Sequence, residues 1–451
     1  MNAIGLDIGT TTISAVVIDS ATGEIRQSRT ISNGTDLPGD VPGGKLQDAN
    51  AIIDKVLALT GELTSAYGPI CTIGIDGQMH GIVYIDESGA AVSPLYTWQD
   101  SRGYLPLEDG TYVSRLKALT GYEMSTGFGL TTHYWMTLNG AIPKGAVRMC
   151  TIFDYAAMKL TGRTQPLMHT SGAASWGLFD SVNSKWMEKE IAACGMDPSY
   201  LPEVTDACVT VGSTPDGVPV SCAIGDNQAS FIGSVREADT SVLVNMGTGG
   251  QVSMQGFTPV PLEDLEMRPM GEKKYILVGS TLCGGRAYAL LEKFIRDVAA
   301  LSGYDGGPLY EAVNRVAMEN IEIDEPWTAD TRFSGTRREG SLRGSFTGIS
   351  NNNFDAAHLV SATLNGIADE IMDLYGKIRG AEAARPTQLI GSGNGLRRNL
   401  ALRRVFEKRF GLKMMIPAHT EEAAYGAALF GLAAGGIFSD LNAARALIRY
   451  E

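Results

Sequence analysis

Two short segments place small polar residues between apolar runs, in a pattern that suits phosphate binding. In Gly5–Asp19, the run around Asp7 is followed by a glycine, three threonines at positions 10–12 and a second β-branched run. In Val242–Gln255, an apolar strand again meets a small polar turn, Gly247–Gly250, and a strand returns. A tight turn of small residues presents several backbone N–H groups on one side and so forms an anion-binding nest. Either turn alone reads most simply as an ordinary β-hairpin, but the pair predicts a polyphosphate held from two sides.

Asp226 is a third residue whose position could support chemistry. It follows the apolar run 218–225 and precedes a helix expected over residues 227–235. A carboxylate there lies beside a helix N-terminus and at the carboxyl end of a strand, where open α/β sheets bind ligands. Asp is also among the best N-cap residues, so Asp226 is a candidate for capping, for catalysis, or for both.

The elements that must position these residues alternate between strands and helices. Strands are expected over residues 2–8, 12–18 and 25–31, and a buried strand over 71–76. Between them a helix is expected, with one apolar face made of Ile52, Val56, Leu59 and Leu63.

The second half repeats this alternation. The longest expected helix lies near residues 353–379, with apolar residues spaced three and four apart and Asn353 as its N-cap. After it come a strand at 386–391, a helix at 398–410, a strand at 413–418 and a helix at 421–435. The sequence therefore predicts an α/β protein of two similar halves joined near residues 233–239.

Composition limits the kinds of partner. A chain of 451 residues is too long for one ordinary core, so two domains are expected. The formal net charge of -13 argues against nucleic acid and anionic membranes, because such a surface repels phosphate polymers. The chain enters a strand without a basic leader, and no apolar stretch reaches the roughly 18 residues of a membrane span. We expect six reduced cysteines, a cytoplasmic setting and a surface compatible with a homodimer.

Eight motifs, in this order and at these separations, resemble the FGGY carbohydrate kinases of the actin-like ATPase group. They are GLDIGTT (5–11), GIDGQMHG (74–81), TWQDSR (97–102), AIGDNQAS (223–230), VNMGTGG (244–250), FSGTRREG (333–340), GSGNGLRRN (391–399) and EEAAYGAALFG (421–431). The resemblance implies two actin-like (ribonuclease H-like) ATPase domains with a central cleft. The N-terminal domain, over 1–235, would bind sugar and carry the first phosphate hairpin. The C-terminal domain, over 236–451, would bind the nucleotide.

The resemblance also implies ATP as co-substrate and Mg²⁺ as cofactor. Mg²⁺ keeps most of its waters and takes one or two carboxylates, and Asp7 would be one of them. Thr10, Thr11 and Thr12 would lie near the phosphates. The match to the family's GDNQ segment makes Asp226 the general base that accepts the proton of the attacking sugar hydroxyl, close enough to the phosphates to help hold the metal. An Asx-turn is the competing interpretation of Asp7.

Further residues would contact the two substrates. Sugar hydroxyls need polar partners, because each unpaired buried group costs about 1–3 kcal/mol. The family resemblance supplies the candidates for the sugar: Gln78, Met79, His80, Trp98, Asp100, Arg102, Asn227 and Gln228. The segment 172–176 is a further candidate wall, and Asp100 with Arg102 reads most simply as an ion pair that shapes the pocket. The candidates for the nucleotide are Gly247, Thr248, Gly249, Gly284, Gly285, Gly391, Gly393 and Asn394.

The resemblance implies transfer of the γ-phosphoryl group of ATP to a primary hydroxyl of a ketose. Within the family, GQMHG, TWQDSR, TGFG (126–129) and the segment 166–179 are most similar to members that phosphorylate sedoheptulose at its 7-hydroxyl. The alternative substrate is xylulose or another ketose, because xylulokinases also carry a Met-His pair after the second strand. A catalytically silent sugar sensor and an actin-like polymerising or chaperone ATPase are alternatives from other classes.

Overall fold

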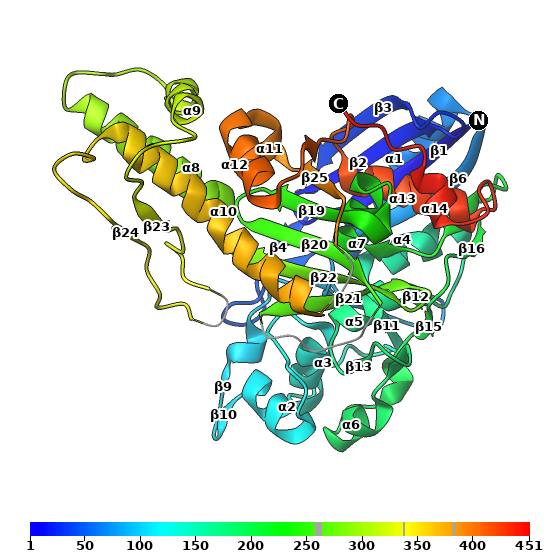
Figure 1. Ribbon diagram of the computed structural model, residues 1–451. Coiled ribbons are helices and arrows are strands. Elements are labelled where there is room, and N and C mark those ends of the chain that lie inside the picture. Colours follow the sequence, from blue (N-terminus) through cyan, green and yellow to red (C-terminus); the bar gives the residue numbers. More distant parts are fainter. Residues whose placement is uncertain (258–263, 337–338, 382–384) are drawn as a thin grey trace. The chain divides into compact units, whose positions relative to one another are not determined.

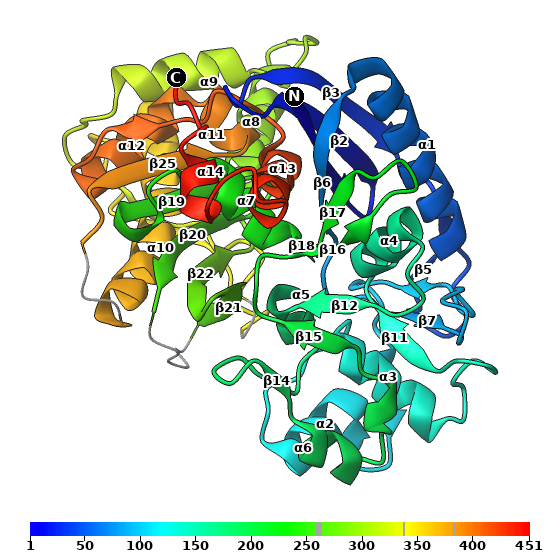
Figure 2. The same ribbon diagram turned by 90° about the vertical axis from the view of Figure 1, so that its right-hand side faces the viewer.

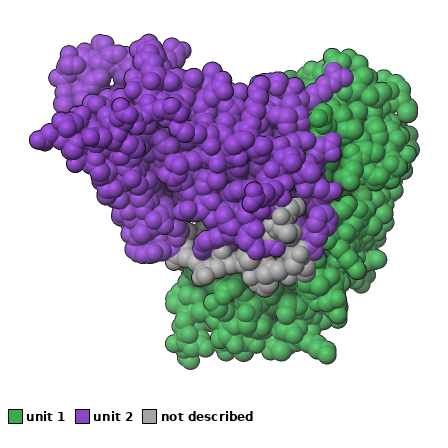
Figure 3. All heavy atoms as spheres, viewed as in Figure 1, with its two compact units in different colours: residues 1–236, 268–275, 421–448 green, residues 237–267, 276–420, 449–451 purple. Residues whose placement is uncertain are grey.

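The computed structural model describes residues 1–257, 264–336, 339–381 and 385–451, which form two compact units (Figure 3). Unit 1 comprises residues 1–236, 268–275 and 421–448. Unit 2 comprises residues 237–267, 276–420 and 449–451. The penultimate stretch of the chain therefore packs with the N-terminal residues. Arg337 and Arg338, within the motif 333–340, lie outside the described residues.

Unit 1 is built on a seven-stranded sheet in the order β16-β17-β6-β1-β2-β3, with β18 beside β6 (Figures 1 and 2). The first three strands form an antiparallel meander, while β6, β17 and β18 run parallel to β1 or to one another. The strands are β1 (Asn2–Ile8), β2 (Thr12–Asp19), β3 (Ile25–Ser32), β6 (Ile70–Gly77), β16 (Thr210–Ser213), β17 (Pro219–Ser221) and β18 (Ile224–Gly225).

Helices cover both faces of this sheet. Helices α1 (Ala49–Tyr67) and α4 (Ile152–Thr161) lie on one face, and α13 (Glu422–Ala434) lies on the other and packs against α7 (Asp226–Ser234) (Figure 2). Glycine permits this close packing: a Cβ at Gly74 would lie 1.7 Å from the carbonyl oxygen of Ala427. The four residues expected on the apolar face of α1 are all buried.

The rest of unit 1 forms a second core from Leu46 and residues between 82 and 201, which include Tyr84, Trp176 and Trp186. Its strands are β4 (Asp36–Leu37), β5 (Leu46–Gln47), β7 (Val83–Ile85), β8 (Leu95–Tyr96), β9 (Pro106–Leu107), β10 (Gly110–Thr111), β11 (Arg148–Cys150), β12 (Leu167–His169), β13 (Phe179–Asp180), β14 (Lys185–Trp186) and β15 (Glu203–Thr205). Its helices are α2 (Tyr112–Thr120), α3 (Gly129–Leu138), α5 (Thr170–Ser175) and α6 (Glu188–Ala193), and α14 (Leu441–Arg445) follows α13.

Unit 2 has a six-stranded sheet in the order β21-β22-β20-β19-β25-β26, with the long helix α10 packed against β20 and several other helices (Figure 1). Its strands are β19 (Ser241–Met246), β20 (Gly250–Gly256), β23 (Thr328–Asp330), β24 (Ser345–Thr347), β25 (Gln388–Ser392) and β26 (Met414–Met415). The sheet also contains β21 (Leu265–Gly271) and β22 (Lys274–Thr281), whose connected ends, residues 268–275, belong to unit 1. Its helices are α8 (Gly284–Ala300), α9 (Tyr310–Glu319), α10 (Ala356–Ala381), α11 (Asn394–Arg398) and α12 (Leu400–Phe410).

The prediction that Asn353 caps the long helix is wrong. Helix α10 begins at Ala356, and the Asp355 carboxylate accepts a hydrogen bond from the backbone N–H of His358 at 3.0 Å. The Asn353 side chain instead donates to the carbonyl oxygens of Glu325 and Gly348, each at 2.9 Å. Asn353 therefore fastens the preceding loop, while Asp355 satisfies the first turn of the helix.

The cysteines and the helix lengths were both considered in the sequence-based expectations. The six cysteines are free thiols. Across the described ranges, every helix is too short or too polar to cross a bilayer.

Candidate active site

Three carboxylates meet at one edge of the unit 1 sheet. Asp7 and Asp76 are register partners on the parallel strands β1 and β6, each one residue before its strand ends. Asp226 is the first residue of α7, directly after β18, which also pairs with β6. Gly225 occupies the N-cap position, so Asp226 lies in the first turn, where the helix dipole favours a negative charge. The structure thus brings together Asp7 and Asp226, which are remote in sequence.

Burial raises the pKa values of all three carboxyl groups, and like charge raises those of Asp7 and Asp76 further. Burial and the neighbouring Asp226 raise the pKa of Asp7 to about 7. Burial, followed by the charges of Asp7 and Asp226, raises the pKa of Asp76 well above its usual range. Burial also raises the pKa of Asp226, against which the nearby Arg268 guanidinium acts in the opposite direction. The site is therefore poised to accept positive charge or protons.

The donor set fits magnesium in kind, because it consists of carboxylate oxygens. Asp76 is fully buried, and neither of its oxygens accepts a hydrogen bond from any residue that the structure describes. When protonated, Asp76 donates a side-chain hydrogen bond to the Asp7 carboxylate, and once ionised it would need a cation, because a buried charge requires a partner. Within the described ranges, no three acidic, histidine or cysteine side chains are arranged to ligate one ion directly. That geometry is compatible with Mg²⁺ held largely through its own waters.

The β1–β2 turn is tied to the first predicted sugar residues. The Thr10 hydroxyl donates to the Gln78 side-chain oxygen at 3.1 Å, and the Trp98 indole N–H donates to the Thr10 hydroxyl at 2.9 Å. Gln78 is buried, whereas Trp98 is 47% exposed. Thr11 and Thr12 are exposed at the tip of the turn. The structure therefore joins predicted phosphate and predicted sugar residues through one hydroxyl.

His80 is held in a strained and specific orientation. Its backbone adopts a φ of 73°, in the left-handed region that non-glycine residues rarely occupy. The backbone N–H of His80 donates to the Ser175 hydroxyl at 3.1 Å, and the ring Nδ1 lies 2.6 Å from the Ser175 carbonyl oxygen. A carbonyl can only accept, so Nδ1 carries the proton and Nε2 is the acceptor of the neutral ring. The ring stacks on Phe128 at 4.9 Å between centroids.

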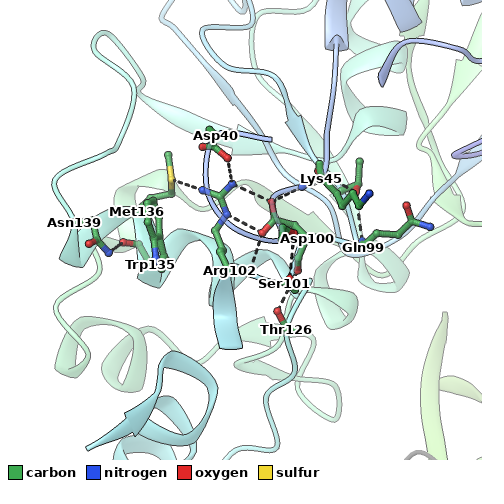
Figure 4. Close-up of polar contacts among 12 residues, drawn as sticks. Asp40, Lys45, Gln99, Asp100, Ser101, Arg102, Thr126, Trp135, Met136 and Asn139 are labelled. Atoms are coloured by element: carbon green, nitrogen blue, oxygen red, sulfur yellow. Dashed lines mark hydrogen bonds and ion pairs between the residues drawn. The ribbon is translucent and has the colours of Figure 1, made fainter. Parts of the chain in front are cut away.

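Asp100 and Arg102 form a fully buried ion pair (Figure 4). The guanidinium donates to both Asp100 oxygens, at 2.8 and 2.9 Å, and to Asp40 at 2.8 Å. It also lies over the rings of Tyr96 and Trp135, at 4.6 and 4.8 Å from their centroids. The expected ion pair is therefore present, and both charges are bound to protein groups.

The predicted sugar residues Asn227 and Gln228 lie with Asp226 in the first turn of α7. The Asn227 backbone N–H donates to the Asp226 carboxylate at 2.7 Å. The buried Gln228 amide donates to the Pro269 carbonyl at 3.0 Å, while its oxygen has no donor among the described residues. A Cβ at Gly225 would lie 2.7 Å from both the Gln228 oxygen and the Met79 sulfur. Met79 and Gln228 thus lie beside the residue that precedes Asp226.

The predicted nucleotide residues other than Thr10–Thr12 lie within unit 2. The turn between β19 and β20 packs on the start of α8, where the N–H groups of Gly285 and Arg286 donate to the carbonyls of Gly247 and Thr248, at 3.1 and 2.9 Å. A Cβ at Gly393, whose φ is 83°, would lie 2.6 Å from the Met246 carbonyl oxygen. Gly249 and Gly284 also permit close backbone approach at this turn, and Gly391 lies in β25, three residues before Asn394 begins α11.

The sequence analysis missed Asp76, Asn33 and Gln47 as residues of the site. Asp76 stands within the motif 74–81, and the clue was its equivalent place to Asp7 at the end of a neighbouring parallel strand. Asn33 and Gln47 touch the β1–β2 turn from distant segments, and nothing in the local sequence signals these contacts.

Comparisons with known proteins agree with this fold. Residues 2–233 match the N-terminal domain and residues 242–435 the C-terminal domain of the FGGY family of carbohydrate kinases. The chain is similar to the sedoheptulokinase of Mus musculus, with 27% identity over 94% of this chain and 96% of the relative. It is also similar to the xylulose kinase of Staphylococcus xylosus, with 24% identity over 97% and 92% of the two chains. The xylulose kinase structure from Rhodospirillum rubrum matches with a TM-score of 0.86 and 21% identity, over 100% and 93% of the two chains.

The family models together cover most of the chain, so it belongs to the FGGY family of carbohydrate kinases. It is a phosphotransferase with the two-domain, actin-like ATPase fold, as the motifs predicted.

Proposed function

We propose that this chain is an ATP-dependent ketose kinase that transfers the γ-phosphoryl group to a primary hydroxyl, converting sedoheptulose to sedoheptulose 7-phosphate. This proposal rests on the grouping of Asp7, Asp76 and Asp226 beside the β1–β2 turn, whose Thr10 binds Gln78. The similarity to mouse sedoheptulokinase over nearly the full length of both chains supports the choice of sugar.

Asp226 is the proposed general base. Its carboxylate would accept the proton of the sugar hydroxyl as that oxygen attacks the γ-phosphorus. Phosphoryl transfer proceeds through a largely dissociative transition state, so orientation and charge stabilisation contribute more of the rate than proton removal. The first turn of α7 holds this carboxylate, which also accepts a hydrogen bond from the Asn227 N–H.

Asp7, with Asp76 behind it, is the proposed anchor of a hydrated Mg²⁺, and Asp226 lies close enough to assist. Magnesium bound there would neutralise charge on the β- and γ-phosphates. The backbones of Thr10–Thr12 and of Gly247–Gly249 would contact the phosphates. Gly284, Gly285, Gly391, Gly393 and Asn394 would border the rest of the nucleotide.

Gln78, Met79, His80, Trp98, Asn227 and Gln228 are the proposed sugar contacts. The Nε2 atom of His80 can accept from a hydroxyl, and the Trp98 indole offers an exposed face for a sugar ring. Asp100 and Arg102 act in this proposal by holding the segment that carries Trp98, because their charges are already paired.

A panel of ketoses tests the substrate. Sedoheptulose, xylulose, ribulose and fructose would be compared by kcat/KM with ATP and Mg²⁺, and the phosphorylated position identified by NMR. We expect sedoheptulose to give the highest value and a 7-phosphate product. A higher value for xylulose would identify the alternative ketose kinase. Sugar binding with no transfer to any ketose would reject the kinase and favour a sugar sensor.

A further inference from the structure

The β1–β2 turn is held from one side through its carbonyl oxygens. The Asn33 side-chain N–H donates to the Gly9 carbonyl, the Gln47 side-chain N–H to that of Thr10, and the Asn33 backbone N–H to that of Thr11, each at 2.8 Å. In a trans peptide the N–H points away from the preceding carbonyl oxygen. The N–H groups of the next three residues, 10–12, are therefore directed away from these anchors.

Gln47 does more than anchor the turn. It is 1% exposed, and its side-chain oxygen accepts from the Gln78 amide at 3.0 Å while its amide binds the Thr10 carbonyl. The Gln78 oxygen in turn accepts from the Thr10 hydroxyl. Thr10, Gln47 and Gln78 thus form a closed hydrogen-bonded ring. The amide of Gln47 also lies 3.3 Å from the Asp36 carboxylate.

The exposed side chain of Trp98 is hydrogen-bonded to this closed set of Thr10, Gln47 and Gln78. The indole N–H of this exposed residue donates to the Thr10 hydroxyl, which donates onward to Gln78. One hydroxyl therefore receives a bond from one proposed sugar contact and gives a bond to another. Any ligand that fixes Gln78 or Trp98 also restrains the turn at Thr10.

We propose that Gln47 is a positioning residue that couples the sugar site to the phosphate turn. The inference rests on the proposed function, since it assigns sugar to Gln78 and Trp98 and phosphate to residues 10–12. Sugar binding would order the ring, so the nucleotide would meet a turn that has already lost its freedom. Two ligands that share one ordering cost bind with positive cooperativity.

Two substitutions of Gln47 separate its two contacts. Gln47→Leu removes both the donor to Thr10 and the acceptor for Gln78. Gln47→Glu keeps an oxygen for Gln78 but places a second oxygen against the Thr10 carbonyl and the Asp36 carboxylate. Gln255→Leu is the matched control, because Gln255 is a buried glutamine of unit 2 whose amide binds Asp239.

The measurements are the dissociation constants of Mg-ADP, with and without sugar, and of sedoheptulose, by titration calorimetry on the full chain. We expect Gln47→Leu to weaken both ligands by about 5–30-fold, the effect of losing one or two hydrogen bonds to a positioned group. We expect Gln47→Glu to weaken ADP by a similar factor while sedoheptulose changes less than about threefold. In the wild type and in Gln255→Leu, sugar should tighten ADP, and in Gln47→Leu this gain should disappear.

Affinities in Gln47→Leu that match those of Gln255→Leu would overturn the proposal. So would equal losses of both ligands in Gln47→Leu and Gln47→Glu, because a merely structural role would not separate them. Failure of the proposed function has a different signature: a wild type that phosphorylates no ketose rejects the kinase, whereas an active wild type with normal ligand binding in Gln47→Leu rejects only the role of Gln47.

Discussion

Asp7 and Asp76 occupy the same level of two neighbouring parallel strands, and a side-chain hydrogen bond joins their carboxyl groups. One of the pair, Asp76, is fully buried and has no hydrogen-bond donor among the described residues. Such an arrangement weakens the fold, because desolvation and like charge both oppose ionisation. It is suited to a site that acquires positive charge when its ligands bind.

Replacing Asp76 with Asn should stabilise the metal-free protein. The raised pKa values of Asp7 and Asp76 mean that their contribution to stability is present below about pH 4 and is lost as pH rises through the folded-state values, about 7 for Asp7. At pH 8 and without Mg²⁺, Asp76→Asn should raise Tm by about 2–6 °C, as calorimetry would measure.

The same variant should respond less to Mg²⁺. In the wild type, Mg²⁺ should raise Tm at pH 8, and in Asp76→Asn this gain should shrink. Asp216→Asn, at an exposed turn, is the control and should change neither quantity. A metal-free Tm that falls in Asp76→Asn would contradict this view of the three carboxylates.

Asp154 should impose a second, separate pH dependence on stability. Burial raises its pKa from 3.8 to about 7. One of its oxygens accepts a hydrogen bond from the hydroxyl of Thr151, the N-cap residue of α4. The native state therefore holds this proton more tightly than the unfolded state, and unfolding free energy should fall by about 1.4 kcal/mol per pH unit between pH 4 and 7 from this group alone.

Urea denaturation across that pH range would measure the effect. The curve for Asp154→Asn should lack this decline, so the variant should gain stability relative to the wild type as pH rises from 5 to 8. Parallel curves for the two proteins would show that Asp154 titrates normally in the fold.

The sequence predicted the parts of the site that follow a local pattern. The expected strands at 2–8 and 12–18 match β1 and β2, and the expected strand at 71–76 lies within β6. Asp7 and Asp226 could be chosen because Asp7 lies in an apolar run that ends at Gly9 and Asp226 follows one that ends at Gly225. Asp76 ends a similar run, but its importance depends on the pairing of β6 with β1, which brings it against Asp7.

Long-range contacts were beyond such patterns. Gln47 binds Thr10 and Gln78 from a two-residue strand, and Asn33 reaches the turn from the end of β3. The error at Asn353 has a similar origin, because its amide is bound by the nearby Gly348 carbonyl and by the carbonyl of Glu325, which is distant in sequence.

Arg102→Met should destabilise unit 1 strongly. The substitution leaves the fully buried Asp100 without its counter-ion, a loss worth about 3–5 kcal/mol of unfolding free energy. Arg26→Met is the comparison, because Arg26 forms a 3.0 Å ion pair with Asp19 but is 41% exposed, and exposed pairs contribute about 0–1 kcal/mol. Denaturation midpoints that shift equally in the two variants would contradict the structural role of Arg102. The double variant Asp100→Asn/Arg102→Met should recover part of the loss.

The central claim is that Asp226 carries out proton transfer beside Asp7. The most direct measurement is steady-state kinetics of Asp226→Asn with ATP, Mg²⁺ and the preferred ketose, with Asp216→Asn as the control. We predict a fall in kcat of about 10²–10⁴-fold, the usual contribution of a general base, with the ketose KM changed by less than about threefold. A kcat close to that of the wild type would contradict the account.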